Sequence, residues 1–416
     1  MPPTPTFLYV TCQNRAEPAL KNELQREWDE LRFAYSRPGF LTFKLSPALP
    51  VSFVTQFDVT TLRSVFARSA GFTLGRAKGT TREELARSVW DMASGAEIGL
   101  QHLHVWQRDT IAAGRIEFVP GPTMLSRSIE QLLRASAPVE FPWGTKSTSQ
   151  PALPGQMVLD CIIIDEQEWW VGYHRAETMF SRWPGGLLEW ELPPGIVSRA
   201  YLKMEEALLW SGLPMQAGQR VVELGSAPGG ASQALLKRGL EVTGVDPAEM
   251  HADVLSHPKF KHVRKKNKYV PHEVYREAAW LTSDINMPPN YTLDAVEGAL
   301  SVPGARLHGV LLTLKLNEWS VAEQVPELLD RVRSWGFRDV RARQLQFNRQ
   351  EICVAATDWA KPARQRPAKV AKPKVRDEQE DRDEVSEKPE SRERKRPPKS
   401  RPAGKPPRTG RERPRG

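Results

Sequence analysis

Cysteine is scarce in this chain, with only three in 416 residues. Cys12, Cys161 and Cys353 each lie in an apolar, strand-like run, and none belongs to a CxxC pair or to a cluster of cysteine and histidine. Structural zinc sites and disulfide frameworks need closely spaced or paired cysteines, so this spacing argues against both. We expect three buried, reduced thiols and no metal site.

Long hydrophobic runs are also missing. No apolar stretch approaches the ~18 residues that a membrane-spanning helix needs. The first six residues, MPPTPT, have neither the basic start nor the apolar stretch of a secretory signal. The sequence therefore predicts a soluble protein of a reducing compartment, the cytoplasm, without a membrane partner. Nothing in it indicates an obligate protein partner.

The net charge of +9 is concentrated at one end of the chain. Residues 360–416 hold 20 Lys and Arg against 10 Asp and Glu, which leaves 39 against 40 for residues 1–359. Residues 361–416 also contain ten prolines and almost no large apolar side chain, so we expect a disordered basic tail. Such a tail would attract RNA without sequence preference, or would serve only as a solubilising extension. RNA binding by the remainder must come from local patches.

The rest of the chain divides into segments by its hydrophobic pattern. Residues 1–80 alternate strands and helices as a small α+β (ferredoxin-like) domain, and residues 81–178 repeat that mixture and end in a hairpin. After a linker at 179–197, residues 198–359 alternate strand and helix strictly, which is typical of a doubly wound, mostly parallel sheet. A closing hairpin would add one antiparallel strand. The predicted fold class is an α/β, Rossmann-like sheet preceded by an α+β region.

A glycine-rich turn joins the first strand of that sheet to the helix that follows. The residues concerned are Glu223, Gly225, Ser226, Ala227, Pro228, Gly229 and Gly230. Glycine lets the backbone approach a ligand closely, and the start of a helix offers free N–H groups. The turn lacks the G-x-G-x-x-G spacing of a dinucleotide site. The acidic Glu223 disfavours a phosphate and suits a ligand with an amino group, such as S-adenosylmethionine.

Asp246 ends the second strand of the sheet. It follows the glycines by about 20 residues, where a carboxylate can accept hydrogen bonds from both ribose hydroxyls of an adenosine. Together with the turn it predicts S-adenosylmethionine as the cofactor. The alternative, an ordinary strand–turn–helix with glycine in the turn, stays open.

Four further ionisable residues lie in a predicted helix or at the ends of predicted strands. Lys203 lies in a helical segment, Asp284 and Lys315 close the fourth and fifth strands, and Glu351 opens the last strand. A lysine inside the apolar run 311–316 is costly to bury without a partner, and Asp284 is the natural one. A site that removes the proton from a weak acid is one interpretation, with Lys315 as the base and Lys203 as the cation that lowers its pKa. A structural ion pair, a solvated lysine and an edge-strand carboxylate are the alternatives.

These segments resemble the FtsJ-type ribose 2′-O-methyltransferases, a family whose signature is a Lys-Asp-Lys-Glu tetrad around an S-adenosylmethionine loop. The run SRAYLK at 198–203 is similar to the family's first lysine motif, and Ser283–Asp284 is similar to its aspartate motif. Lys315 and Glu351 match the later lysine and glutamate. The resemblance covers about residues 196–357. It implies a catalytic set of Lys203, Asp284, Lys315 and Glu351, and a cofactor site of Glu223, Gly225, Ser226, Ala227, Pro228, Gly229, Gly230, Asp246 and Asp284.

Within that family, the α+β N-terminal half resembles the RlmM branch. That branch acts on large-subunit ribosomal RNA and carries a THUMP RNA-binding module, so the resemblance implies a THUMP-like domain at 81–178 and ribosomal RNA as the partner. The chain departs from many relatives in having Glu223 where they have aspartate. The run LNEW after Lys315 matches no family role that we can assign.

Two other functions stay open on the sequence. An RNA base methyltransferase would use the same cofactor, but an amine-directed enzyme needs an Asn/Asp-Pro-Pro-aromatic motif, of which DINMPP at 284–289 is only a loose echo. A pyrimidine C5 enzyme needs a catalytic cysteine, and no cysteine lies at a suitable strand end. A non-catalytic RNA-binding or ribosome assembly factor would keep the fold without the chemistry, and the intact tetrad argues against it.

Overall fold

The computed structural model describes residues 4–112, 120–145, 151–191 and 193–359. The basic tail that the sequence predicts at 360–416 lies outside these residues. Within the described ranges, no helix combines the length and the apolar character that crossing a membrane requires.

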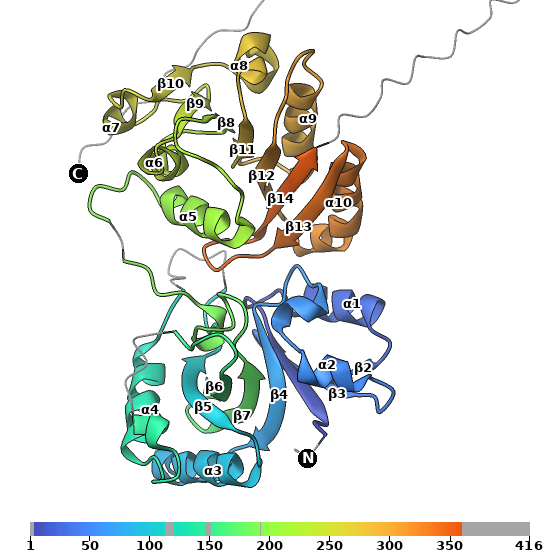
Figure 1. The fold of residues 1–416 in the computed structure, drawn as a ribbon, viewed down its shortest axis with the longest axis vertical. Helices are drawn as coiled ribbons and strands as arrows, with labels where there is room; N and C mark the ends of the chain where they lie inside the picture. Colours follow the sequence, from blue (N-terminus) through green and yellow to red (C-terminus); the bar gives the residue numbers. More distant parts are fainter. Residues whose placement is uncertain (1–3, 113–119, 146–150, 192, 360–416) are drawn as a thin grey trace, which may run out of the picture. The chain divides into compact units, whose positions relative to one another are not determined.

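The N-terminal half is built on one seven-stranded sheet (Figure 1). All neighbouring strands are antiparallel except β5 and β6. In spatial order the strands are β2 (Leu31–Arg37), β3 (Phe40–Leu45), β1 (Phe7–Thr11), β4 (Ser69–Arg76), β7 (Glu168–Arg175), β6 (Met157–Asp165) and β5 (Leu100–Gln107). The helices of this half are α1 (Glu17–Glu27), α2 (Val51–Thr55), α3 (Arg82–Gly95) and α4 (Met124–Ala135).

The sequence pattern predicted most of these elements. The expected hairpin is confirmed by β6 and β7, which pair in antiparallel register. The edge strand β2 was not expected, because only its first residue, Leu31, is buried and the rest shows no apolar alternation.

Strand pairing crosses the boundary expected near residue 80. β4 pairs with β7, so that Phe72 lies opposite Tyr173, and the two rings are 5.6 Å apart between centroids. Residues 1–80 and 81–178 therefore share one sheet and one hydrophobic core. Their description as two separate domains stays a prediction.

The second half forms another seven-stranded sheet. In spatial order its strands are β10 (Phe260–Val263), β9 (Glu241–Val245), β8 (Arg220–Leu224), β11 (Trp280–Ser283), β12 (Gly309–Lys315), β14 (Glu351–Trp359) and β13 (Phe337–Arg343). The first five are mutually parallel, and β14 runs antiparallel to both of its neighbours. The expected fold class, a mostly parallel Rossmann-like sheet with a closing antiparallel hairpin, is confirmed. The strand order reverses at β8, and ligands of such sheets bind at this switch point.

Figure 1 shows the helices of the second half beside this sheet. They are α5 (Ala200–Ser211), α6 (Gly230–Lys237), α7 (Ala252–Leu255), α8 (His272–Arg276), α9 (Pro289–Leu300) and α10 (Val325–Ser334). The apolar spacing over residues 321–335 predicts one amphipathic helix, but the structure divides this stretch into a 3₁₀ segment, Trp319–Gln324, and α10, whose first turn contains Pro326. The sequence pattern did not predict α9, which begins with Pro289 at a position where helices accept proline.

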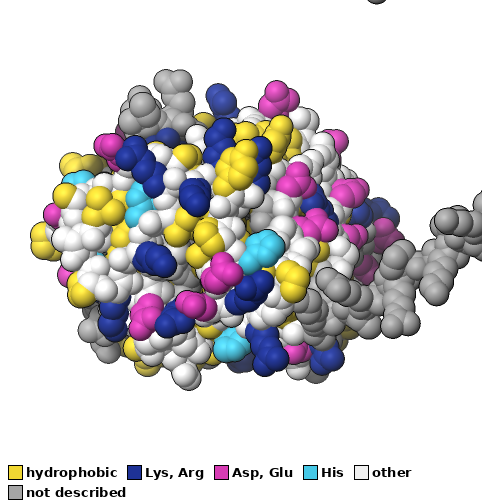
Figure 2. All heavy atoms as spheres, turned by 90° about the horizontal axis from the view of Figure 1, so that it is seen from above, with side chains coloured by type: hydrophobic (Ala, Val, Ile, Leu, Met, Phe, Trp, Pro, Cys, Tyr) yellow, Lys and Arg dark blue, Asp and Glu magenta, His cyan; other side chains and the backbone are white. Residues whose placement is uncertain are grey.

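The burial of the cysteines and the mixture of charges on the surface are those expected from the composition. All three cysteines are free and buried, as expected, and burial raises the pKa of the Cys353 thiol. Figure 2 shows one face of the molecule, on which Lys and Arg side chains are interspersed with acidic and hydrophobic ones. This mixture fits the near-neutral charge of residues 1–359.

Candidate active site

Three strand ends bring charged side chains to one edge of the second sheet. Asp284 directly follows β11 and Lys315 ends β12, and because these strands are parallel neighbours their carboxyl ends meet at the same edge. Glu351 opens the antiparallel strand β14 and lies opposite Lys315 in the register. Lys203 comes from the beginning of α5.

These four side chains form a closed ring of alternating charge. Lys203 Nζ lies 2.5 Å from Glu351 Oε1 and 3.4 Å from Asp284 Oδ2. Lys315 Nζ lies 2.5 Å from Glu351 Oε2 and 2.8 Å from Asp284 Oδ1. Each lysine thus contacts both carboxylates, and each carboxylate uses a different oxygen for each lysine. The structure brings together all four residues that the sequence singled out, and the expected contact between Asp284 and Lys315 is confirmed.

The ring is largely shielded from water. The side chains of Lys203, Asp284 and Lys315 are 14 to 19% exposed, and that of Glu351 is 4% exposed. Burial alone would raise the pKa of Asp284, but the two lysines outweigh burial and lower it. Burial would lower the pKa of Lys315, but Asp284 and Glu351 outweigh it and raise this pKa above the ordinary lysine range.

This direction corrects one expectation. We expected Lys203 to lower the pKa of Lys315, and that expectation is wrong for the structure. Asp284 and Glu351 alternate with the two lysines around the ring, so each lysine lies beside two carboxylates. The attraction of Lys315 to these two carboxylates determines the direction of the shift in its pKa.

A cavity of about 550 Å³ opens beside the ring. Its volume lies within the range of pockets that bind small molecules or single nucleotides. Both lysines and Glu351 contribute to its wall, and several further polar side chains to which the sequence assigned no role do so as well. The lining residues are Ser198, Arg199, Ala200, Lys203, Asn286, Lys315, Leu316, Asn317, Phe347, Arg349, Gln350 and Glu351.

The glycine-rich turn packs tightly against the segments that carry the ring. Gly225 and Gly229 have φ angles of 77° and 116°, which residues with side chains rarely adopt. A Cβ at Gly225 would lie 3.0 Å from the carbonyl oxygen of Asp284, and a Cβ at Gly230 would lie 2.1 Å from Ser198 Oγ. Glycine is therefore needed where the turn approaches the strand end of Asp284 and the segment that leads into α5.

Asp246 fastens this turn to the end of β9. Its Oδ2 accepts a hydrogen bond from the backbone N–H of Ala227 at 3.2 Å, and its Oδ1 accepts one from Ala248 at 2.8 Å. A carboxylate has about four acceptor sites, so Asp246 can still accept hydrogen bonds from a ligand.

Glu223 and Ser226 are buried beneath the turn. The carboxyl group of Glu223 accepts a hydrogen bond from the hydroxyl of Ser232 at 2.5 Å, while the Ser226 hydroxyl lies 3.5 Å from the sulfur of Met250. Burial raises the pKa of Glu223 to about 8; the hydrogen bond from Ser232 opposes this rise, and the charges of Asp284 and Asp246 add to it. At neutral pH Glu223 is therefore mostly protonated, and a cation nearby would favour its charged form.

The loop between β13 and β14 forms one wall of the cavity and is held from two sides. From α5, the two carboxylate oxygens of Glu206 accept hydrogen bonds from the N–H groups of Gln346 and Phe347, at 2.8 and 2.9 Å. From the N-terminal half, Gln13 Nε2 donates to the carbonyl oxygens of Leu345 and Asn348, at 2.9 and 2.6 Å. The sequence showed Glu206 one helical turn after Lys203, but it gave no signal for Gln13.

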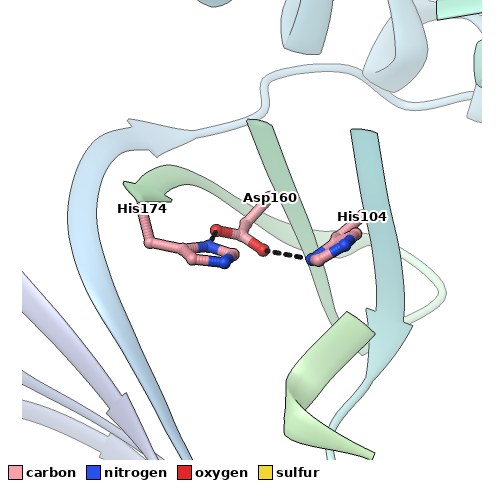
Figure 3. Close-up of side chains that lie close together, drawn as sticks. All are labelled: His104, Asp160 and His174. Atoms are coloured by element: carbon pink, nitrogen blue, oxygen red, sulfur yellow. Dashed lines mark hydrogen bonds and ion pairs between the residues drawn. The ribbon is translucent and has the colours of Figure 1, made fainter. Parts of the chain in front are cut away.

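A second cluster of ionisable side chains lies inside the N-terminal sheet and was not expected (Figure 3). It consists of His104 on β5, Asp160 on β6 and His174 on β7, all buried. His174 Nδ1 lies 2.5 Å from Asp160 Oδ2, and its Nε2 lies 2.6 Å from the carbonyl oxygen of Ser181. Burial would lower the pKa of His174, but Asp160 and the carbonyl group of Ser181 outweigh burial and raise it. Both ring nitrogens of His174 are engaged in these contacts, which favours a structural role for this cluster over metal binding.

The four residues of the ring lie within a segment that matches a known protein family. Residues 196–381 match the model of the FtsJ-like methyltransferase family. A protein of Halorhodospira halophila called "Ribosomal RNA large subunit methyltransferase M" is 33% identical over 189 residues, which cover 44% of this chain and 53% of that protein. A protein of the same name from Thauera aminoaromatica is 31% identical over 188 residues, covering 42% and 50%. The chain thus matches about half the length of these relatives.

Solved structures show weaker likeness. TrmN from Thermus thermophilus is 15% identical with a TM-score of 0.31, covering 84% of this chain and 99% of that one. A chain of the fibrillarin/Nop5p complex is 14% identical with a TM-score of 0.32, covering 38% and 82%. The family match is the most informative of these comparisons: the sequence of residues 196–381 is that of an FtsJ-like methyltransferase domain.

Proposed function

We propose that this chain transfers a methyl group from S-adenosylmethionine to a ribose 2′-hydroxyl of RNA, and that large-subunit ribosomal RNA is the substrate. The observation that carries the proposal is the closed ring of Lys203, Asp284, Lys315 and Glu351 beside the glycine-rich turn. The names of the relatives support ribosomal RNA as the substrate class. The cytoplasmic location expected from the sequence suits that substrate.

S-adenosylmethionine is the cofactor, and the residues at the switch point fit it. The close approach at Gly225 and Gly230 leaves a turn without side chains at the carboxyl edge of β8, where a ligand can reach the backbone. We assign the adenosine ribose to Asp246 and the methionine end to the turn 225–230 and Asp284. Glu223 beneath the turn would become charged beside a cationic ligand. When bound, the cofactor supplies an electrophilic methyl group.

In the proposed mechanism, the ring removes the proton that the hydroxyl must lose. The proton of the 2′-hydroxyl would pass to the neutral amine of Lys315, and the cofactor held by Asp246 and the turn would supply the methyl group that replaces this proton on the 2′-oxygen. Asp284 and Glu351 stabilise the ammonium that results, which is why the pKa of Lys315 is raised. Lys315 is thus a strong base whose neutral form is rare at neutral pH. Lys203 shares both carboxylates and keeps them in place between the two lysines.

A base methyltransferase is less well supported by the site. A pyrimidine C5 enzyme needs a reactive cysteine, and all three cysteines are buried, with burial raising the pKa of Cys353. We further propose that the N-terminal sheet, including a THUMP-like region at 81–178, holds the RNA while the ring acts on the ribose.

Product analysis tests this function directly. Unmodified large-subunit ribosomal RNA would be incubated with the protein and methyl-labelled S-adenosylmethionine, then hydrolysed in alkali. A ribose 2′-O-methyl group blocks cleavage of the adjacent linkage, so we expect the label in an alkali-resistant dinucleotide. Label in a mononucleotide with a methylated base would overturn the proposal in favour of a base methyltransferase. No label above the level of a Lys315→Ala control would favour a non-catalytic RNA-binding factor.

A further inference from the structure

Two arginines stand in the wall of the catalytic cavity beside the ring. Arg199 directly precedes α5, four residues before Lys203, and Arg349 lies two residues before Glu351. Arg199 is exposed and Arg349 is partly exposed. Both therefore border the space next to the reacting groups without belonging to the ring.

Neither arginine has an ion-pair partner among the described residues of the chain. The carboxylates of the ring, those of Asp284 and Glu351, each contact two lysines already. Partial burial lowers the pKa of Arg199, and the positive charge of Arg349 lowers it further, against the opposing effect of Glu351. Both arginines line the same cavity, and an anion bound there would relieve the repulsion between their charges.

The backbone that carries Arg349 is fixed before any ligand arrives. Its N–H donates to Glu351 Oε1 at 3.4 Å, and its carbonyl oxygen accepts from Gln344 Nε2 at 3.0 Å. The preceding residues are held by Glu206 and Gln13. Because this backbone is already held in place, binding a ligand restricts only the side chain of Arg349. The entropic cost of a contact between Arg349 and a ligand is therefore low.

The chemistry of RNA puts an anion at this position. The 2′-oxygen and the 3′-oxygen of a ribose are on adjacent carbons, and inside an RNA chain the 3′-oxygen carries a phosphodiester. A ribose whose 2′-hydroxyl meets Lys315 therefore brings a negative charge within a few bonds of the ring. Arginine pairs with phosphate through two parallel N–H donors, which fixes orientation as well as charge.

We propose that Arg199 and Arg349 together bind the phosphodiester on the 3′ side of the target ribose and so align its 2′-hydroxyl with Lys315. This inference rests on the proposed ribose methylation, because it names the part of the substrate that the same site holds. It makes the two arginines positioning residues. It also means that a nucleotide inside an RNA chain is a substrate, while a free nucleoside or a 3′-terminal nucleotide is a poor one.

A binding experiment tests the arginines without relying on methyl transfer. The probes are the dinucleotide adenylyl-(3′→5′)-adenosine and its methylphosphonate analogue, which differ in the charge of the linkage, titrated into the full chain and followed by NMR. We expect the wild-type protein to bind the charged probe about tenfold or more tightly than the neutral one, since hydrogen bonds to charged groups have that magnitude. The double variant Arg199→Gln/Arg349→Gln should lose this preference. Equal affinity of the wild type for both probes, or an undiminished preference in the double variant, would overturn the proposal.

Two controls make the result specific. Arg306→Gln removes an exposed arginine that precedes β12, at the opposite edge of the sheet, and should keep the wild-type preference. Arg199→Lys and Arg349→Lys keep the charge and lose the two-donor geometry, so each should give an intermediate preference. If the double variant melts at a lower temperature than the wild type, these lysine variants decide the question, and lysine variants identical to the wild type would contradict the proposal.

Kinetics separate this inference from the function on which it rests. With a ribosomal RNA substrate, the double variant should lose about ten- to a hundredfold in kcat/KM while its affinity for S-adenosylmethionine stays unchanged. Full ribose methylation by the double variant would overturn the role of the arginines and leave the proposed function intact. A preference for the charged probe without ribose methylation of any RNA would overturn the proposed function and leave the phosphodiester site standing.

Discussion

The carboxylate of Glu206 accepts a hydrogen bond from the backbone N–H of Phe347 at 2.9 Å. Glu206 lies one helical turn beyond Lys203 on α5, so one helix supplies a lysine of the ring and also holds a wall of the cavity. Burial raises the pKa of Glu206 to about 7, although the N–H groups of Phe347 and Gln346 oppose the rise. A carboxylic acid whose pKa is raised in the folded protein stabilises the fold less as pH increases, because the unfolded chain releases the proton first.

Glu206→Gln should remove this pH dependence. Between about pH 4.5 and pH 7 the folded protein keeps a proton that the unfolded chain has lost, so the wild-type free energy of unfolding should fall across that window. The glutamine variant does not titrate, and its stability should fall less steeply over the same range. Urea unfolding at a series of pH values measures both slopes. Glu323→Gln, at an exposed position, is the control and should follow the wild type; parallel curves for the wild type and Glu206→Gln would show that Glu206 does not titrate there.

Gln13→Ala should weaken the catalytic loop from the N-terminal side. The change removes two hydrogen bonds to the buried carbonyl oxygens of Leu345 and Asn348, at a cost of about 1–3 kcal/mol in the free energy of unfolding. It should also lower kcat for methyl transfer, because the loop leads directly to Arg349 and Glu351. Thermal melting and steady-state kinetics provide the two measurements. Gln25→Ala, exposed on α1, should change neither, and a Gln13→Ala variant with normal kcat would mean that the loop does not need this support.

Local patterns in the sequence were enough for the fold class of the second half and for the meeting of the four ring residues. Lys315 closes an apolar run that becomes the buried strand β12, and a lysine there needs a carboxylate, which Asp284 at the next strand end supplies. Parallel pairing then brings both residues to one edge. These steps depend on where each strand ends and on whether the strand is buried. Short segments of sequence indicate both.

What the sequence missed depends on pairing between distant segments. His104, Asp160 and His174 come from three strands and meet only because β6 lies between β5 and β7. The direction of the shift in the pKa of Lys315 depends on distances to Glu351 and Asp284 that no local pattern fixes. The hydrogen bond of Gln13 to the loop between β13 and β14, and the position of Arg349 in the cavity wall, both depend on the path of that loop. Only the folded chain shows this path.

Lys315→Ala should abolish methyl transfer while the protein still binds S-adenosylmethionine. The amine is the proposed proton acceptor, and removal of a general base costs about 10²–10⁴ in rate. The variant leaves Asp284 and Glu351 with Lys203, so the ring keeps one cation and the fold should persist. Radiolabel transfer and calorimetric titration of the cofactor measure the two properties. Lys44→Ala, exposed on β3, is the control, and wild-type turnover of Lys315→Ala would remove Lys315 from the chemistry.

Asp246→Ala should weaken the binding of S-adenosylmethionine by about tenfold or more. The substitution removes the proposed partner of the ribose hydroxyls and also the acceptor for the N–H of Ala227 in the turn. Asp253→Ala, whose carboxylate is exposed and outside the turn, provides the comparison. Calorimetry that gives equal affinities for the wild type and Asp246→Ala would place the adenosine elsewhere on the edge of the sheet.

The rate of methyl transfer should rise with pH well above neutrality. Only the neutral amine of Lys315 can accept a proton, and Asp284 and Glu351 raise the pKa of this lysine in the folded protein. At every pH below that pKa, the neutral fraction increases about tenfold per pH unit, so kcat should increase with a slope near one from pH 7 to beyond pH 9. Glu223, with its pKa raised to about 8, titrates in the same range, so the measurement is repeated with Glu223→Gln. The slope should survive in that variant if it comes from Lys315. A rate that levels off below pH 8 in both proteins would mean that another group accepts the proton and that Lys315 acts only through its positive charge.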